Sequence, residues 1–382
     1  MASTSDPRTK KDILLETLGV DLSKCSSEFS NTEKAKLADL LLDHKEAFAI
    51  EGGDIGLYPV QARIPSIPDR AFNQPQHPID YGHRKLVDTE VKSMYDDGII
   101  EDCLDSKGWN SPVFIVEKSD GSPRFVVNFK RTLNEALIEE DTFVVGCCDS
   151  TLKEIGLHNE YYGSFDFKSG YWQIGLFPEH RHKTAFCLGG RNYQFTRVPF
   201  GLNTSENIFS RAVSHALRDA VSFKGLSIYV DDIFLHCRTF IQYFDLIKKI
   251  LKGCIDHNVK VSGKKTKLFL KDAQFLGRRI TKTGYLPVEE YVQGIASITP
   301  PNNKTQLQVL TGRLLWCKDH SEARVGEKVA QNSFAALMKP MTALLKKSLF
   351  GFQKPKKLLR SQLNVSEQRL FSGLQTLIVN LY

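Results

Sequence analysis

Residues 226–237 read LSIYVDDIFLHC, and this stretch decides the fold that we expect. Two adjacent carboxylates, Asp231 and Asp232, interrupt a β-prone apolar run, where a buried charge is costly unless it is paired or binds a metal. Adjacent strand residues point to opposite faces of a sheet, so two successive acids belong at a tight turn between strands. The stretch therefore predicts two strands joined at a turn where both carboxylates approach one cation cluster.

A third carboxylate, Asp166, interrupts the hydrophobic run YYGSFDF at 161–167. If this strand pairs beside the first, three hard oxygen donors converge, and such donors suit Mg²⁺ or Mn²⁺. Two ions about 3.5–4 Å apart can activate an attacking hydroxyl and stabilise a leaving pyrophosphate. A lone buried Asp is more often a capping or turn residue, so only the constellation of three favours a metal site.

The remaining patterns alternate strands with helices. Apolar spacing predicts helices over 32–50, with Thr32 as N-cap, and over 86–97, ended at Gly98, and a Gly- and Pro-rich linker over 52–80. A D-G pair within KSDGSP predicts a hairpin between strands at 111–117 and 124–129. The chain thus reads as α+β with a helical C-terminal part. Further expected elements are strands over 161–166, 226–236 and 259–286 and helices over 205–220, 240–257, 305–347 and 366–380.

Charge is unevenly distributed along the 382 residues. The chain carries a net charge of +7, yet residues 240–360 hold 23 Lys and Arg against 8 Asp and Glu. A basic C-terminal half favours a polyanion partner, most simply nucleic acid, although ordinary solvated helix faces explain the charge equally well. No apolar run of 18 residues, no N-terminal h-region and no C-x-x-C pair is present. We therefore expect no membrane span, no secretion and no zinc knuckle or disulfide scaffold.

At its carboxylate motifs the sequence resembles a reverse transcriptase, in particular the polymerase of Gypsy-type LTR retrotransposons and their retroviral relatives. The resemblance runs nearly collinearly from about residue 44 to residue 382, and five blocks in the right order make a coincidence very unlikely. These blocks are the fingers segment at 96–129, FDFKSGYWQI at 165–174, KTAF with RVPFGL at 183–202, YVDD at 229–232 and FLGRRITKTGYLPVEEYVQGI at 275–295.

The resemblance implies an α+β right-hand polymerase with fingers, an antiparallel palm sheet with helices, and a helical thumb. On this basis we divide the chain into an N-terminal extension (1–60), fingers and the start of the palm (61–160), palm (161–285, with a fingers segment near 175–205), thumb (286–350), and a linker with a truncated start of an RNase H-like domain (351–382). It implies an RNA-directed DNA polymerase and, in this chain, no RNase H, protease or integrase activity.

The family's functional residues carry over at matching positions. Asp166, Asp231 and Asp232 would be catalytic and would bind two Mg²⁺ or Mn²⁺ ions, assisted by the backbones of Phe167 and Val230. Tyr171 would exclude a ribonucleotide 2′-OH by a steric clash, unless it is only a core aromatic beside Trp172. The dNTP site would comprise Lys118, Arg124, Phe167, Tyr171, Phe200 and Gly201. The primer–template site would comprise Tyr229, Lys264, Lys265, Phe275, Leu276 and Gly277, with phosphate contacts from Lys264–Lys267 and Lys346–Lys357.

Several positions depart from the family pattern. VNFKRTLN at 127–134 stands where VDYRALN is usual, NTSE at 203–206 lacks the usual Pro, and LLWCKD at 314–319 alters an aromatic-rich run. Two hypotheses follow: an active polymerase module, or a catalytically inactive truncated or co-opted remnant that binds nucleic acid. A third, a group II intron or telomerase type of palm polymerase, is disfavoured by the KTAF and PFGL blocks.

The same resemblance suggests partners and a location. The partners would be an RNA and DNA template–primer and dNTPs, with other pol or gag products or a second copy of the chain as further candidates. The expected location is a cytoplasmic virus-like particle, with nuclear entry as a further possibility.

Overall fold

The computed structural model of the chain describes residues 10–50, 53–117, 121, 123–138, 151–152, 155, 158–296, 304–316 and 338. The chain divides into two compact units, residues 1–271 and 272–382. The expected helix over 366–380, the linker over 351–360 and most of the expected helix over 305–347 lie outside the described residues. None of the helices that the described residues form is long and apolar enough to span a membrane.

The centre of the first unit is a four-stranded antiparallel sheet with the strand order β10-β11-β6-β13. Its strands are β10 (Leu226–Tyr229), β11 (Asp232–Cys237), β6 (Tyr161–Asp166) and β13 (Lys267–Leu270). The predicted strands over 161–166 and 226–236 are confirmed, and the second is divided by a turn.

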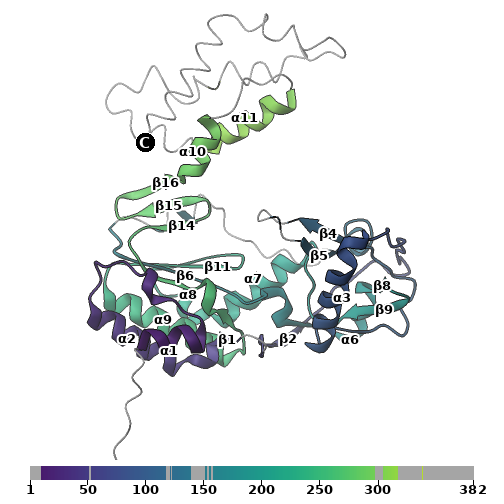
Figure 1. Ribbon diagram of the computed structural model, residues 1–382, viewed down its shortest axis with the longest axis horizontal. Coiled ribbons are helices and arrows are strands. Elements are labelled where there is room, and N and C mark those ends of the chain that lie inside the picture. Colours follow the sequence, from purple (N-terminus) through teal and green to yellow (C-terminus); the bar gives the residue numbers. More distant parts are fainter. Residues whose placement is uncertain are drawn as a thin grey trace, which may run out of the picture. The chain divides into compact units, whose positions relative to one another are not determined.

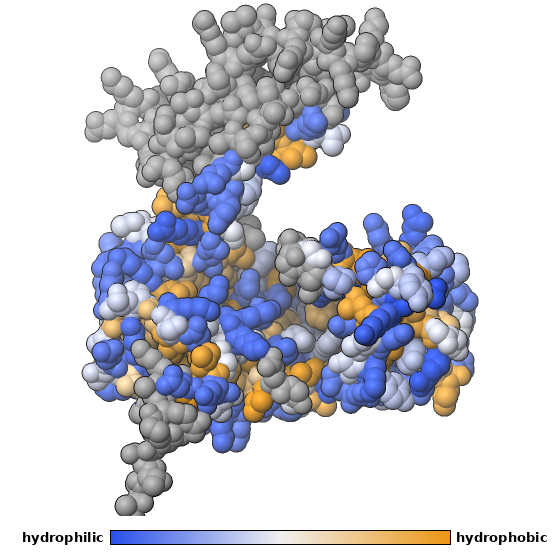
Figure 2. All heavy atoms as spheres, viewed as in Figure 1, coloured by the Kyte–Doolittle hydropathy of each residue, from blue (hydrophilic) through white to orange (hydrophobic). Residues whose placement is uncertain are grey.

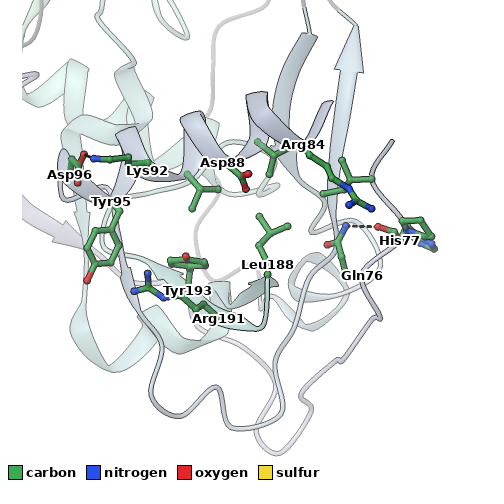
Figure 3. Close-up of a pocket in the computed structure, with 15 residues that line it drawn as sticks. Gln76, His77, Arg84, Asp88, Lys92, Tyr95, Asp96, Leu188, Arg191 and Tyr193 are labelled. Atoms are coloured by element: carbon green, nitrogen blue, oxygen red, sulfur yellow. Dashed lines mark hydrogen bonds and ion pairs between the residues drawn. The ribbon is translucent and has the colours of Figure 1, made fainter. Parts of the chain in front are cut away.

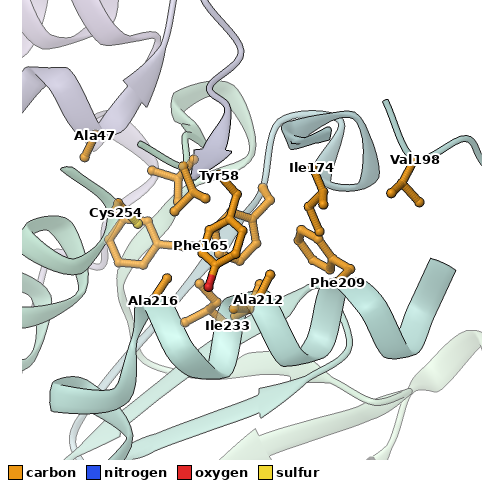
Figure 4. Packing of buried hydrophobic residues seen from close by; sticks show 14 of the residues in the cluster. Ala47, Tyr58, Phe165, Ile174, Val198, Phe209, Ala212, Ala216, Ile233 and Cys254 are labelled. Atoms are coloured by element: carbon orange, nitrogen blue, oxygen red, sulfur yellow. The ribbon is translucent and has the colours of Figure 1, made fainter. Parts of the chain in front are cut away.

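One face of this sheet packs on helices. Side chains alternate along β6 and β11, so Phe165 and Ile233, which are register partners, point to the same face. Figure 4 shows both beside Ala212 and Ala216 of α7 (Ser205–Ala216), and all four are buried. α8 (Arg218–Val221) and α9 (Phe240–Asp256) complete this layer, and Figure 1 shows α9 with α1 (Lys10–Leu18) and α2 (Asn31–Asp43) at one end of the unit.

At the other end of the first unit, short strands surround α3 (Tyr81–Asp96) (Figure 1). The predicted hairpin is confirmed as β4 (Val113–Glu117) paired with β5 (Pro123–Val127), and a three-stranded sheet has the order β3-β9-β8. The other strands here are β2 (Tyr58–Ala62), β3 (Ile100–Asp102), β7 (Ile174–Leu176), β8 (Phe186–Leu188) and β9 (Arg191–Phe195).

The connecting elements complete the first unit. The parallel pair β1 (Phe48–Ala49) and β12 (Val261–Ser262) joins the N-terminal helices to the central layer. The short helices are α4 (Leu133–Ala136), α6 (Pro178–Arg181) and the 3-10 helices η1 (Leu22–Lys24), η2 (Lys45–Ala47), η3 (Gly170–Gln173), η4 (His182–Thr184) and η5 (Gly263–Lys265). On the face seen in Figure 2, hydrophilic residues dominate the first unit and hydrophobic ones form small separate groups.

Three sequence predictions are wrong in detail. The helix expected over 32–50 ends at Asp43, and residues 48–49 form β1. Ser30, and not Thr32, caps α2: its hydroxyl accepts from the Glu33 amide, while the Glu33 carboxylate accepts from the Ser30 amide. This reciprocal pair is a capping box, which satisfies two amide groups that the first helical turn leaves open. The segment 52–80 is also more than a linker, because it contains β2, which pairs in parallel with β7.

In the second unit, the described residues form a three-stranded antiparallel sheet and two helices. The strands β14 (Ala273–Phe275), β15 (Arg278–Thr281) and β16 (Gly284–Pro287) follow one another in order, as the alternating pattern over 259–286 predicts. α10 (Glu289–Ala296) and α11 (Lys304–Trp316) follow. The Arg278 guanidinium lies 3.4 Å from the centre of the Trp316 ring, so the sheet and α11 are held together.

Candidate active site

The turn between β10 and β11 places one carboxylate at its tip. Tyr229 and Asp232 are register partners, so the loop between them consists of Val230 and Asp231 alone. Val230 has φ 55°, in the left-handed region where a β-branched residue is a genuine outlier. Such strain persists only where the surroundings over-determine the conformation, and it clusters at functional sites. The tight turn predicted from the two adjacent acids is confirmed.

The register of β6 and β11 brings the third carboxylate to the same place. Asp166 is the direct partner of Asp232 across the two strands. Opposite residues on one face of an antiparallel pair have Cβ atoms roughly 4.5–5.5 Å apart. Asp166 and Asp232 therefore lie side by side at the end of the sheet, next to the turn that carries Asp231. The predicted pairing of the two strands holds.

Negative charge concentrates at this end of the sheet. The pKa of Asp232 is raised by partial burial, then by the carboxylates of Asp231 and Asp166, while Lys265 opposes the shift. The Lys265 ammonium contacts both Asp166 oxygens, at 2.9 and 3.2 Å. Lys265 was predicted to contact nucleic-acid phosphate, and its partner here is a carboxylate. Among the described residues, Lys265 is the cation recorded against these carboxylates, so their negative charge is offset only in part.

The chemistry of this donor set suits a divalent metal. The three carboxylates supply hard oxygen ligands, and a further cation nearby would offset the burial and the mutual repulsion that raise the pKa of Asp232. Among the described residues, no three His, Cys, Asp or Glu side chains are already arranged to hold a metal ion. Binding would therefore require Lys265 to leave Asp166 and the carboxylates to reorient.

An aromatic cluster lies beside the carboxylates. Tyr171, in η3, packs against Phe200 with ring centres 5.0 Å apart and edge-on against Phe209 at 5.5 Å. Phe209 also meets Phe167 edge-on at 5.3 Å. Burial, followed by the charges of Asp231 and Glu206, raises the pKa of Tyr171 to about 12. The Tyr171 hydroxyl therefore stays protonated at neutral pH, close to the carboxylate cluster.

The predicted dNTP residues converge on this cluster as far as they are described. The Arg124 guanidinium, on β5, lies 5.1 Å from the centre of the Phe200 ring. Gly201 has φ 92°, a conformation that favours glycine, and its carbonyl accepts from the Asn134 side chain at 2.9 Å. Lys118 lies outside the described residues. Phe209 was not predicted as a site residue, because its only signal is its place on the apolar stripe of α7.

The predicted primer residues lie in both units. In the second, Leu276 and Gly277 form the turn between β14 and β15, with φ 49° and 69°, as a type I′ turn requires. Phe275 is buried, so only its backbone is available for contact with a ligand. In the first unit, Tyr229 flanks the carboxylate turn, and the stem of Lys264 lies beside Gly19.

A pocket of about 840 Å³ lies away from these residues, between α3, residues 76–79 and the β8–β9 hairpin (Figure 3). None of the predicted site residues lines it. Lys92 forms an ion pair with Asp96 within it, and Arg191 donates to Asp102 at 2.8 Å. Because the pocket contains none of the predicted catalytic residues, the carboxylate end of the sheet is the better candidate for chemistry.

Comparison with solved structures shows that the chain has the right-hand polymerase fold. A foamy viral protease-reverse transcriptase in complex with double-stranded DNA matches with a TM-score of 0.77 and 20% identity, covering 98% of this chain and 62% of that one. The same viral enzyme in complex with an RNA/DNA hybrid gives a TM-score of 0.73. At this identity the likeness shows the fold, which the sequence analysis predicted.

Sequence comparison specifies the type of polymerase domain. Residues 116–280 match the family described as "Reverse transcriptase (RNA-dependent DNA polymerase)". The Pol polyprotein from transposon gypsy of Drosophila melanogaster is 29% identical over 320 residues, covering 82% of this chain and 29% of that protein. The enzymatic polyprotein of cauliflower mosaic virus (strain CM-1841) is 32% identical, with coverages of 70% and 37%. Residues 116–280 thus form a reverse transcriptase domain, and the chain is similar to gypsy-type and cauliflower mosaic virus polyproteins, of whose length it spans about a third.

Proposed function

We propose that this chain is an RNA-directed DNA polymerase that extends a primer 3′-OH with dNTPs. The observation that carries the proposal is the register of β6 and β11, which puts Asp166 opposite Asp232, together with the turn that adds Asp231. This carboxylate cluster belongs to a reverse transcriptase domain and adjoins the aromatic cluster around Tyr171.

The carboxylates would hold two Mg²⁺ ions, assisted by the backbone carbonyls of Phe167 and Val230. When bound, the ions supply charge stabilisation for an in-line attack of the 3′-OH on the α-phosphate, with pyrophosphate as the leaving group. The chain's own contribution is to fix the oxygen donors on a rigid sheet. Lys265, released from Asp166 by metal binding, is then available for a phosphate.

Tyr171 and Arg124 would bind the incoming nucleotide. Tyr171 stays neutral. Its ring is packed between Phe200 and Phe209, so a 2′-OH on the sugar would clash with the ring. Arg124 would offer a bidentate fork to the triphosphate from the β4–β5 hairpin, and Lys118 a point charge from the same hairpin. Gly201 would let the backbone approach the nucleotide closely.

Template and primer would be held mainly through phosphates. The basic residues Lys264 and Lys265 and the turn at Leu276 and Gly277 would contact the duplex without reading its sequence. We place this activity in a cytoplasmic virus-like particle, by analogy with the gypsy-type relatives. The affinity for a duplex held in this way should fall steeply as the salt concentration rises, because each phosphate contact releases counterions on binding.

Primer extension with the purified chain tests the proposal. The assay uses oligo(dT) on poly(rA), with Mg²⁺ or Mn²⁺, and compares the wild type with Asp231→Asn. Asp219→Asn, an exposed aspartate on α8, is the matched control. We expect extension by the wild type and the control and a loss of at least about 100-fold in Asp231→Asn.

The competing function is a nucleic-acid-binding remnant without catalysis. The observation that favours it is that no metal cage is preformed among the described carboxylates. Salt-sensitive binding of the primer–template with no extension in either metal, by a chain with intact circular dichroism, would establish this second function and overturn the first.

A further inference from the structure

The side-chain amide of Gln173 is fully used inside the protein. Gln173 ends η3 and is 0% exposed. Its Nε2 donates to the Lys168 carbonyl and to the Lys260 carbonyl, each at 2.8 Å, and its Oε1 accepts from the Lys260 amide at 2.7 Å. Such a buried network is stabilising only while every member is satisfied. Gln173 therefore acts through specific hydrogen bonds and does not only fill space in the core.

These bonds join the two segments that border the carboxylate cluster. Lys168 lies between Phe167 and the turn that presents Tyr171, whereas Lys260 leads through β12 into η5, which carries Lys265. The Lys260 carbonyl also accepts from the Lys168 amide at 3.1 Å, and Phe167 forms a bridge with Val261. Gln173 thus reinforces the backbone contact between these two segments.

The turn that Gln173 closes is strained. Ser169, between Lys168 and η3, has φ 50°, in the left-handed region that is unfavourable for a non-glycine residue. Its carbonyl accepts from the Trp172 amide at 2.8 Å, so the position of the Tyr171 backbone depends on this conformation. Two hydrogen bonds hold the turn in place. Gln173, at the end of η3, donates to the Lys168 carbonyl before Ser169, and the Trp172 amide in η3 donates to the Ser169 carbonyl.

We propose that Gln173 is a positioning residue for nucleotide selection. By clamping Lys168 to Lys260 it holds the strained turn, and thereby fixes how far the Tyr171 ring projects beneath the incoming sugar. This inference rests on the proposed polymerase function. Without the clamp the turn relaxes, the ring withdraws, and a ribonucleotide is accepted more readily, while the carboxylates and their register remain unchanged.

The test compares Gln173→Met with Gln194→Met. Methionine keeps the length of the side chain and removes the amide. Gln194 is a half-buried glutamine whose Nε2 donates to Glu101 at 2.7 Å on the β3–β9 sheet, so its replacement is a matched control. We expect Gln173→Met to lower the ratio of kcat/KM for dNTP over rNTP about tenfold, with the dNTP effect mainly in KM. Adding Ser169→Gly, which removes the strain, should restore part of the ratio.

A second readout does not need catalysis. Hydrogen exchange of the peptide around 168–174 should accelerate in Gln173→Met and stay unchanged in Gln194→Met, even if the wild type extends no primer. An inactive wild type would contradict the polymerase proposal, but the exchange measurement would still test the positioning role of Gln173. An unchanged nucleotide ratio in an active, folded Gln173→Met, or unchanged exchange, would overturn the inference. If Gln173→Met does not fold, Gln173→Glu keeps the volume and serves both measurements.

Discussion

The two ends of one sheet face differ completely. Asp166 and Asp232 lie at one end of the β6–β11 pair, and Tyr162 and His236, also register partners, lie on the same face four residues away. The first end is accessible and charged. At the second, Tyr162 is 1% and His236 6% exposed, and the Phe234 ring stacks between them at about 6 Å from each. The buried end anchors strands whose other end carries charges that repel each other, so chemistry and stability should respond separately to substitution.

The largest effect should come from the charged end. Asp232→Asn should reduce primer extension at least about 100-fold, because a carboxylate ligand becomes a neutral amide. Its thermal midpoint should equal or exceed that of the wild type, since the pKa of Asp232 is raised first by burial of its charge and then by repulsion from Asp231 and Asp166, and the neutral amide removes both costs. Calorimetry beside the extension assay checks both. A marked loss of stability would mean that the carboxylates hold the fold together, against the contrast drawn here.

Acid should act at the buried end. Burial lowers the pKa of His236 to about 4, and its Nε2 is 3.0 Å from the Ser227 hydroxyl. The unfolded chain binds this proton near pH 6.5 and the folded chain only near pH 4, so stability falls as pH drops through this window. The full loss is about 3 kcal/mol, at about 1.4 kcal/mol for each unit of pKa difference.

Urea unfolding at pH 7, 6 and 5 measures the contribution of His236. His180 and His182 also have lowered pKa values through burial and nearby cations, so the wild type alone does not isolate it. The contribution of His236 is isolated by plotting the free energy of unfolding against pH for the wild type and for His236→Gln. The slope of this plot should be smaller for the variant. Parallel slopes would show that His236 does not set the acid sensitivity.

A smaller loss of stability should follow removal of one hydroxyl. Tyr243, 0% exposed on α9, donates to the Tyr162 carbonyl and accepts from the Phe269 amide, each at 3.2 Å. Gly163 makes room for this hydroxyl, because a Cβ there would lie 2.5 Å from it. Tyr243→Phe removes one hydrogen bond to the Tyr162 carbonyl and one from the buried Phe269 amide, and it should cost about 1–3 kcal/mol.

Primer extension per folded molecule should be unchanged in Tyr243→Phe. This variant thus loses stability and keeps activity, whereas Asp232→Asn loses activity and keeps stability. Tyr81→Phe, at a residue 83% exposed, is the control and should change neither quantity. The measurement is urea unfolding followed by primer extension at a matched concentration of folded protein. A fall in the extension rate would show that the buried end of the sheet tunes the charged end.

The sequence predicted the part of the site that local pattern determines. Acids that break β-prone runs locate the turn at Asp231 and the strand end at Asp166, and alternation makes their pairing the natural arrangement. β2 was missed because its sequence, YPVQA, contains Pro59, which cannot donate to a ladder and signals an edge or a loop. Contacts between polar side chains leave no periodic trace, so the pairing of Lys265 with Asp166, 99 residues away, could not be read from the chain.

The smallest effect should come from Lys265, at the charged end of the sheet. Lys265→Met removes the cation that occupies Asp166, so Mn²⁺ should bind a few-fold more tightly in the absence of nucleotide. An exposed ion pair contributes roughly 0.2–1 kcal/mol, which sets the size of the gain. Lys252→Met is the matched control, since Lys252 forms a similarly exposed pair with Asp256 on α9. Electron paramagnetic resonance of unbound Mn²⁺ measures the affinity. Unchanged or weaker binding in Lys265→Met alone would mean that Lys265 assists the metal, and that the carboxylates accept both cations together.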